Sequence, residues 1–194
     1  MSAFAGAAII AGWIGEHELA AHTVAIQLAA FTYMFASGIS IAGMIKTGET
    51  WEQKKYKKTL DIGRNTFLLV SVFMAISALA FVIFRIPMVR LFADNTEVII
   101  IASELMILAA FFQFFDGIQA VSLGLLRGMN DTKIPSYITL VVYWVIALPL
   151  AYYLGIHTNL AMTGVWIALT VALVLASVAL YLRFLNITKS KIQS

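Results

Sequence analysis

Long apolar runs separated by short polar joints are the dominant pattern along this chain. The runs predict six helices, at about residues 1–14, 19–45, 65–84, 98–126, 134–154 and 160–182. Each of the last five holds about 20 mainly apolar residues, the length that a helix needs to cross about 30 Å of hydrocarbon. Runs this long lack the alternating pattern of barrel strands, and a helix pairs its own backbone groups within lipid. The pattern therefore predicts an all-α integral membrane protein with about six transmembrane helices, the first of them truncated.

The charged residues gather in the joints, where they indicate which way the helices run. If six helices alternate in direction, one side of the membrane collects eleven lysines and arginines, and the other side only Arg85 and Arg90. Cytosolic loops are enriched in basic residues. We therefore expect a multi-pass protein of the cell membrane (plasma or inner) with both termini in the cytosol. The basic joint Thr50–Asn65 is expected to form either a short interfacial helix or a solvated loop.

Composition excludes several classes of function. Hydrophobic residues make up 61% of the 194 residues and charged residues only 12%, so the lipid bilayer is the expected partner. The chain has no cysteine, which excludes disulfides and thiolate metal sites. Its net charge of +3 is spread over the joints, so no nucleic-acid partner is expected. The sequence contains no nucleotide-binding or hydrolase motif, and we expect neither an enzyme nor a cofactor.

One carboxylate lies deep within an apolar run. Asp116 precedes Arg127 by about 11 residues, or about 16 Å along a helix, which places it near the middle of the bilayer. A carboxylate at that depth costs about 2.5–3.5 kcal/mol and is expected to face a cavity or a partner. Gln113 and Gln119 lie three residues to either side and extend a polar stripe along the helix. The stripe predicts a cation-coupling site for a proton or a sodium ion, and the alternative is a protonated aspartate that bonds a neighbouring helix.

Other polar residues within the runs carry weaker signals. Gln27 and Tyr33 are candidates to line a substrate cavity. Glu104 lies about 18 Å from Asp116 toward the outer interface, where we expect water to hydrate it. A lone histidine near a helix end, His22, is expected to have a structural role.

Small residues and one proline predict how the helices pack and bend. Close approach of helix backbones is expected at small residues; these are Gly38, Ser40, Ala42, Gly43, Ser122 and Gly124. Pro149 lies inside the run 134–154, where it removes a backbone hydrogen bond and is expected to kink the helix. The kink would serve either as a hinge or as a static bend.

Three stretches resemble the C-terminal half of the multidrug and toxic compound extrusion (MATE) family. The family's eighth helix is similar to GWIGEHELAAHTVAIQLAAFTYMFASGISIAGMIKTGE. Its tenth helix and the following loop are similar to FADNTEVIIIASELMILAAFFQFFDGIQAVSLGLLRGMNDTKIP, and its twelfth helix is similar to GVWIALTVALVLASVALYLRF. The resemblance runs over essentially the whole chain.

The resemblance implies that residues 1–194 form the C-terminal lobe of a twelve-helix transporter. Such transporters exchange protons or sodium ions for organic, often cationic, compounds by alternating access. It also implies that Asp116 takes part in cation coupling. A cytosolic loop motif is implied at Arg127, Gly128, Asp131 and Pro135. The N-terminal lobe is absent from this sequence and is an implied partner, and Lys46-Thr47-Gly48 departs from the Arg-Val-Gly that is usual in the family.

Two other functions remain open at this point. A lipid-linked oligosaccharide flippase of the same superfamily would be expected to carry basic residues inside its helices, whereas this chain carries them at the helix ends. A membrane subunit or fragment that does not transport is the second alternative. The chain is expected to be either a fragment of a full transporter or a half-size one.

Overall fold

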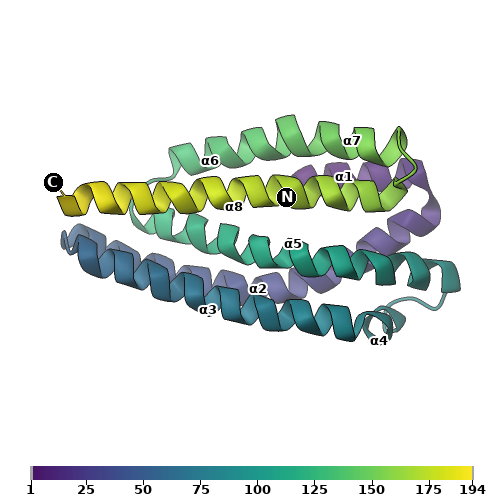
Figure 1. The fold of residues 1–194 in the computed structure, drawn as a ribbon, viewed down its shortest axis with the longest axis horizontal. Helices are drawn as coiled ribbons and strands as arrows, with labels where there is room; N and C mark the ends of the chain where they lie inside the picture. Colours follow the sequence, from purple (N-terminus) through teal and green to yellow (C-terminus); the bar gives the residue numbers. More distant parts are fainter. Residues whose placement is uncertain (1, 194) are drawn as a thin grey trace.

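Helices account for nearly all of the computed structural model, which describes residues 2–193. They lie side by side along one axis and form an elongated bundle (Figure 1). The elements in chain order are α1 (Ser2–Ile14), α2 (Glu16–Glu52), α3 (Tyr56–Ile83), α4 (Arg85–Arg90), α5 (Thr96–Gly128), α6 (Lys133–Leu140), a π-helical segment (Val141–Ala147), α7 (Leu148–Ile156) and α8 (Ala161–Gln193).

The number of membrane spans agrees with the apolar pattern. Five stretches of the described chain are long and apolar enough to cross a membrane; they are Glu16–Glu52, Tyr56–Ile83, Thr96–Gly128, Lys133–Ile156 and Ala161–Gln193. The apolar helix Phe4–Ile14 is shorter, as expected. The prediction of an all-α membrane protein with about six helices is confirmed.

Helix α5 lies at the centre of the bundle. It packs against α2, α3 and α8, and its residues supply much of the buried core. Large apolar side chains on the outer helices point away from this core; Phe31 is 63% exposed and Leu69 58% exposed. Such a surface suits a lipid environment, because an apolar side chain gains no hydrophobic free energy by moving from hydrocarbon into the protein interior.

Small residues set the distance between α2 and α5. A Cβ atom added to Gly128 would lie 2.4 Å from the backbone oxygen of Met44, and one added to Gly124 would lie 2.7 Å from the backbone oxygen of Ser40. At the same contact, the Ser40 hydroxyl donates a 2.7 Å hydrogen bond to the backbone oxygen of Ala120. Any larger residue at either glycine would push the two helices apart.

The prediction of small-residue contacts holds for some positions and is wrong for others. Gly43 is buried against Thr66 and Leu125. Gly38 and Ala42 are exposed, and no atom lies within 4 Å of a Cβ built on Gly38. These two positions face outward because α5 covers only one side of α2.

Within the polar joint at residues 50–65, only residues 53–55 form a turn, and the other residues belong to two long helices. Neither a separate short helix nor a loop of this length forms, in contrast to both sequence-based alternatives. Helix α2 continues to Glu52, and α3 begins at Tyr56. The hydroxyls of Thr50 and Thr59 lie 2.9 Å apart in a buried hydrogen bond that joins the two helices. Both helices extend into this polar stretch because the hydrogen bond between Thr50 and Thr59 holds their ends together inside the bundle.

The last helix is also longer than its apolar run. Helix α8 continues from Leu182 to Gln193, where a basic tail was expected. Phe184 and Thr188 are fully buried at a four-residue spacing, so one side of this extension packs against the bundle.

Pro149 changes the helix in a way that the sequence did not predict in detail. The residues just before it, Val141–Ala147, form a π-helix, and Pro149 lies in the first turn of α7. Proline lacks a backbone N–H and its ring collides with the carbonyl four residues earlier. The π-helical segment replaces the regular hydrogen-bond pattern on the N-terminal side of the proline.

Candidate functional site

A cavity of about 500 Å³ opens between α1, α2, α5 and the α6–π segment. Its walls are mainly apolar, with five aromatic rings; these belong to Phe4, Tyr33, Phe112, Tyr143 and Trp144. Its polar side-chain groups are sparse; they are those of Asp116, Gln119, Ser136 and Thr139, the two tyrosine hydroxyls and the indole N–H of Trp144. An apolar pocket with a few polar groups is the usual form of a small-molecule site.

Helical spacing brings Asp116 to the cavity. Phe112, Asp116, Gln119 and Leu123 recur every three or four residues on α5 and all line the same wall. The Asp116 carboxylate makes no hydrogen bond or ion pair with the residues that the structure describes. The site thus presents one acidic group, without a protein partner, inside a largely apolar cavity.

Gln119 links the cavity wall to the π-helical segment. The Tyr143 hydroxyl donates a 2.7 Å hydrogen bond to Oε1 of Gln119. Tyr143 lies within Val141–Ala147, so this bond ties α5 to the irregular part of the neighbouring helix. π-Helical turns occur frequently at functional sites, and here one carries two of the cavity's aromatic rings.

Gln113 does not reach the cavity with the other two residues of the predicted stripe. It is 1% exposed, and the Thr32 hydroxyl of α2 lies 2.8 Å from its Oε1. Its Nε2 is buried and has no hydrogen-bond partner among the described residues. The polar stripe therefore divides, with Asp116 and Gln119 at the cavity and Gln113 in the contact between α2 and α5.

The two weaker cavity candidates have different positions. Tyr33 lines the cavity together with Ile26. Gln27 is exposed and is not among the lining residues, so the structure does not place it in this cavity. The reason is helical geometry, since Gln27 is turned by about 100° from Ile26 around α2.

Glu104 and His22 lie away from the cavity. Glu104 is exposed on α5. His22 is 2% exposed and meets the Trp166 ring edge-on at a centroid distance of 5.8 Å. Its Nδ1 has no partner among the described residues. Burial against tryptophan fits the structural role expected for His22.

Sequence reasoning missed the wall that α6 and the π-helical segment contribute. Ser136, Thr139, Leu140, Tyr143 and Trp144 all face the cavity. Their spacing of three and four residues is a readable helical face. The polar members were not singled out because hydroxyl side chains are common within membrane helices.

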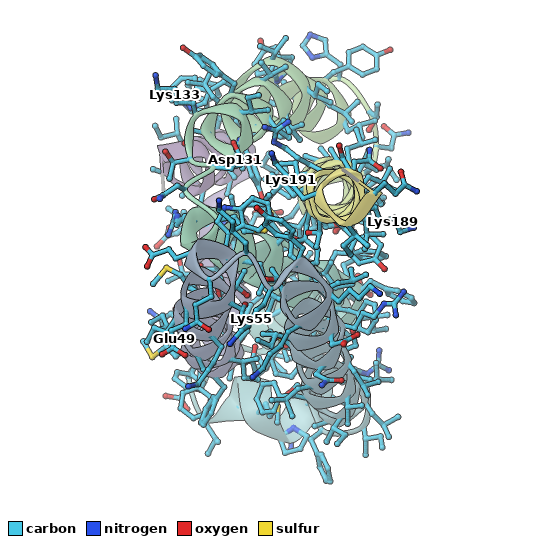
Figure 2. The ribbon with its side chains drawn as sticks, turned by 90° about the vertical axis from the view of Figure 1, so that its left-hand side faces the viewer. Glu49, Lys55, Asp131, Lys133, Lys189 and Lys191 are labelled. Atoms are coloured by element: carbon cyan, nitrogen blue, oxygen red, sulfur yellow. The ribbon has the colours of Figure 1, made fainter. Side chains whose placement is uncertain are left out.

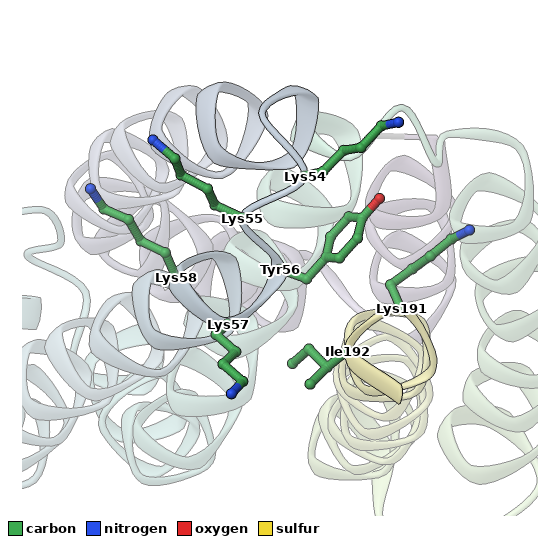
Figure 3. Close-up of a pocket in the computed structure, with 7 residues that line it drawn as sticks. All are labelled: Lys54, Lys55, Tyr56, Lys57, Lys58, Lys191 and Ile192. Carbon is green, nitrogen blue, oxygen red and sulfur yellow. The ribbon is translucent and has the colours of Figure 1, made fainter. Parts of the chain in front are cut away.

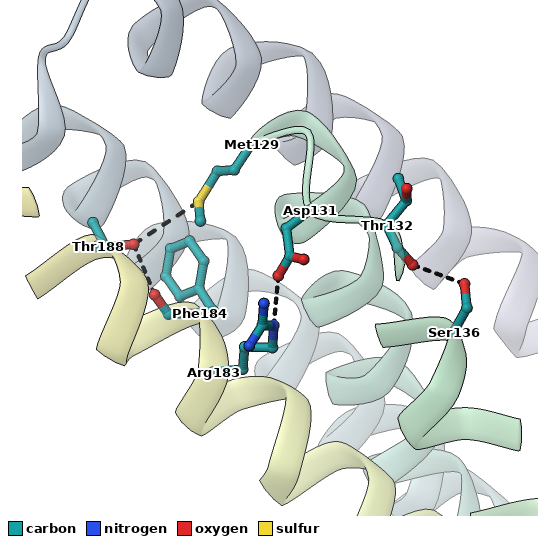
Figure 4. A network of polar contacts seen from close by, with 7 residues as sticks. All are labelled: Met129, Asp131, Thr132, Ser136, Arg183, Phe184 and Thr188. Atoms are coloured by element: carbon teal, nitrogen blue, oxygen red, sulfur yellow. Dashed lines mark hydrogen bonds and ion pairs between the residues drawn. The ribbon is translucent and has the colours of Figure 1, made fainter. Parts of the chain in front are cut away.

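The loop motif after α5 fastens three helices at one end of the bundle (Figure 4). Asp131 accepts a hydrogen bond from Nε of Arg183 on α8. Gly128 forms the close contact with α2, Pro135 is buried in the first turn of α6, and Arg127 is exposed. Gly128, Asp131 and Pro135 thus lie at contacts between helices, and none of the four motif residues lines the cavity.

The described residues contain no cluster of the side chains that commonly bind metal ions. Within residues 2–193, no group of three or more histidine, aspartate or glutamate residues is placed to hold a metal ion. The sodium or proton remains a prediction.

Comparisons with known proteins agree with this architecture. Residues 1–153 match the family model described as MatE. A probable multidrug resistance protein NorM of Agrobacterium fabrum is 34% identical over 98% of this chain and 42% of that relative. Its counterpart of the same name in Mesorhizobium japonicum is 34% identical over 94% of this chain and 40% of that relative. The chain thus spans about two fifths of the length of these relatives.

Solved structures show the same fold. The eukaryotic MATE transporter AtDTX14 superposes with a TM-score of 0.88 at 18% identity, over 97% of this chain and 44% of that one. An outward-facing multidrug resistance MATE family transporter of the MOP superfamily gives a TM-score of 0.90 at 16% identity, over 100% of this chain and 43% of that one. Because the family model matches well over half of its residues, the chain belongs to the MatE (multidrug and toxic compound extrusion) family.

Proposed function

We propose that this chain is the C-terminal lobe of a multidrug efflux antiporter in which Asp116 binds the coupling cation. The observation that carries the proposal is the Asp116 carboxylate, which has no hydrogen-bond or ion-pair partner among the described residues and lies in a cavity walled by aromatic rings. The relatives from Agrobacterium and Mesorhizobium, named as probable multidrug resistance proteins, support the same function.

The cavity chemistry suits an organic cation. A carboxylate without a partner in an apolar cavity gains most from a positively charged ligand, because the pair then leaves no uncompensated charge. Tyr33, Tyr143 and Trp144 add ring faces, which attract cations. The apolar remainder of the wall would bury the hydrocarbon part of the ligand.

Coupling follows from the single carboxylate. One carboxylate neutralises one positive charge, so a proton or a sodium ion bound at Asp116 lowers the affinity for an organic cation. A group that binds two ligands in competition can link their gradients when the two bound states prefer different conformations. Alternating access would need a second half, the N-terminal lobe, on the open side of the cavity.

The orientation of the proposed transporter follows from its charges. The α2–α3 turn, the α5–α6 loop and the end of α8 lie at one end of the bundle (Figure 1). Those joints supply eleven of the thirteen basic residues. We place this end and the C-terminus in the cytosol, and the protein in the cell membrane. The expected cytosolic N-terminus is not part of the proposal, because α1 begins midway along the bundle, where Phe4 lines the Asp116 cavity (Figure 1).

Binding of two ions of matched shape and opposite charge tests the proposal. The purified chain is titrated with tetraphenylphosphonium and with tetraphenylborate. We expect it to prefer the cation, and Asp116→Asn to weaken cation binding at least tenfold, which corresponds to about 1.4 kcal/mol. Glu104→Gln is the control and should bind as the wild type does.

Transport provides the second readout. In the complete transporter that contains this lobe, Asp116→Asn is expected to abolish ion-driven efflux from energised vesicles at matched expression. Normal efflux by Asp116→Asn together with lost efflux by Glu104→Gln would show that another carboxylate couples the ion.

A further inference from the structure

A second cavity lies at the end of the bundle, far from Asp116. It has a volume of about 410 Å³ and opens where the α2–α3 turn meets the end of α8. Its walls carry five lysines and, among the described residues, no acidic one. Four of the lysines come from residues 54–58 and the fifth is Lys191, with Tyr56 and Ile192 between the two elements (Figure 3).

Four of the five lysines of this basic pocket do not pair with the acids near it that the structure describes. Among the described residues, no ion pair includes Lys54, Lys55, Lys57 or Lys58. The neighbouring Glu49 pairs at 3.2 Å with Lys46, which lies outside the pocket. The ammonium groups of Lys54 and Lys191 extend to one side, whereas those of Lys55, Lys57 and Lys58 point in other directions (Figure 3). Like charges on one surface repel each other, and a bound anion lowers that cost.

The start of α3 adds to the same potential. It has no side-chain cap and no acidic residue in its first turn, where Lys57 and Lys58 lie instead. The N-terminal end of a helix carries a partial positive charge, which favours anions and disfavours lysine. The chain therefore places positive side chains at a position where they lower stability unless an anion is bound.

The backbone of Lys54 at the edge of the pocket has an unfavourable conformation. Its φ angle is 57°, in the left-handed region that favours glycine. Glycine there would relieve the backbone but would remove one ammonium group from the pocket. Strain of this kind persists where the surrounding structure or a function requires the side chain.

Tyr56 adds a hydroxyl donor to the lysines. Its ring meets Trp51 at a centroid distance of 5.0 Å, which fixes the direction of the phenol. The Lys54, Tyr56 and Lys191 side chains extend to the same side of the pocket, with the phenol between the two lysines (Figure 3). Two ammonium groups and a hydroxyl are donors suited to the oxygens of a phosphate group.

We propose that this basic pocket binds a phosphate-bearing anion through Lys54, Lys191 and the Tyr56 hydroxyl. Lys191 lies about 14 Å along α8 beyond Leu182, the last exposed large apolar side chain of that helix. The pocket is therefore at the aqueous edge of the headgroup layer, within reach of a lipid headgroup or of a soluble phosphate compound. The proposal does not depend on the transport function of the Asp116 cavity.

Two double variants with the same charge change test the pocket. Lys54→Gln/Lys191→Gln removes two lysines from it. Lys133→Gln/Lys189→Gln removes two exposed lysines that do not line it, although they belong to the same end of the bundle (Figure 2). All four side chains are exposed, so folding is expected to be retained, and circular dichroism checks this.

Two probes distinguish the sources of the phosphate. Pyrophosphate is titrated into the chain in neutral detergent, and nanodiscs of phosphatidylglycerol are compared with nanodiscs of phosphatidylcholine by thermal unfolding. We expect at least one phosphate probe to bind or stabilise the wild type and the control double variant alike. The pocket double variant should lose at least tenfold in pyrophosphate affinity, or lose the stabilisation by phosphatidylglycerol.

The two outcomes assign the source or overturn the site. A loss seen with pyrophosphate identifies a soluble anion site, and a loss seen only with phosphatidylglycerol identifies a lipid headgroup site. Equal losses in the two double variants would show diffuse surface charge and overturn the proposal. A wild-type chain that responds to neither probe would overturn it as well.

Discussion

Nε of Arg183 donates a hydrogen bond to Oδ2 of Asp131, and this ion pair ties the loop between α5 and α6 to α8. The two side chains are 26% and 16% exposed, so water screens the pair only in part. The Asp131 backbone N–H also bonds to the backbone oxygen of Leu126 at 2.9 Å, which fixes the loop on the end of α5. The pair therefore fixes the relative position of two helices that are distant in sequence.

Loss of this pair should destabilise the protein. We expect Asp131→Ala to lower the free energy of unfolding by about 1–3 kcal/mol, because Arg183 is left partly buried without its acceptor. The exposed pair of Lys46 and Glu49 is the control, since its side chains are 65% and 51% exposed. Glu49→Ala should change the free energy by less than about 1 kcal/mol. Thermal unfolding in detergent measures both, and equal effects would contradict the role given to the buried pair.

Two glycines on neighbouring helices should respond oppositely to alanine. A Cβ atom at Gly128 would meet the Met44 backbone at 2.4 Å, and backbone cannot move aside as a flexible side chain can. We expect Gly128→Ala to cost about 1–3 kcal/mol through overpacking. Gly38 has open space around it, so Gly38→Ala should be neutral or stabilise by up to about 1 kcal/mol through helix propensity. If Gly128→Ala unfolds at the wild-type temperature, the close contact of α2 and α5 does not set their spacing.

The buried contact of Thr32 and Gln113 gives a third prediction. Thr32→Val removes the only hydrogen-bond partner of Gln113 among the described residues, and should cost about 1–3 kcal/mol. The double variant Thr32→Val/Gln113→Leu replaces both polar groups and should recover most of that loss. A double-mutant cycle from thermal unfolding measures the coupling, and purely additive effects would show that the hydrogen bond contributes nothing.

Gln113→Leu by itself also tests the predicted cation-coupling set. Gln113 points to α2 and away from the cavity, so the variant should bind tetraphenylphosphonium as the wild type does. Gln119→Leu removes the acceptor of the Tyr143 hydroxyl at the cavity wall and should weaken binding. Weaker binding by Gln113→Leu together with unchanged binding by Gln119→Leu would show that Gln113 belongs to the coupling site.

The helices could be predicted from the sequence because lipid imposes one strong condition. An apolar run long enough to span the bilayer has few alternatives to a helix. The ends of those helices depend on tertiary contacts that have no such pattern. The bond between Thr50 and Thr59, and the burial of Phe184 and Thr188, extend α2, α3 and α8 well beyond their apolar runs.

The candidate site was predictable only in part, for a similar reason. Asp116 could be found because a carboxylate is costly at the middle of a bilayer. Gln113 lies only about 60° from Asp116 around α5, and that angle decides between the cavity and the α2 contact. Which side of α5 faces α2 is set by Gly124 and Gly128, whose partners on α2 cannot be identified from one sequence.

The orientation in the membrane is the last prediction. We expect residue 95 to face away from the cytosol and residue 190 to face it, because basic residues collect at the end of the bundle that includes residue 190. Natural cysteines are absent, so Asn95→Cys and Ser190→Cys each introduce a single thiol without further changes to the chain. Both positions are exposed to solvent, at the start of α5 and near the end of α8.

A membrane-impermeant maleimide added to intact cells should label Asn95→Cys and leave Ser190→Cys unmodified until the membrane is permeabilised. Permeabilisation also provides the control, since both thiols should then react to the same extent. Labelling of Ser190→Cys in intact cells would show that the protein has the opposite orientation. It would also place the basic pocket on the outside, where cytosolic phosphate compounds could not reach it.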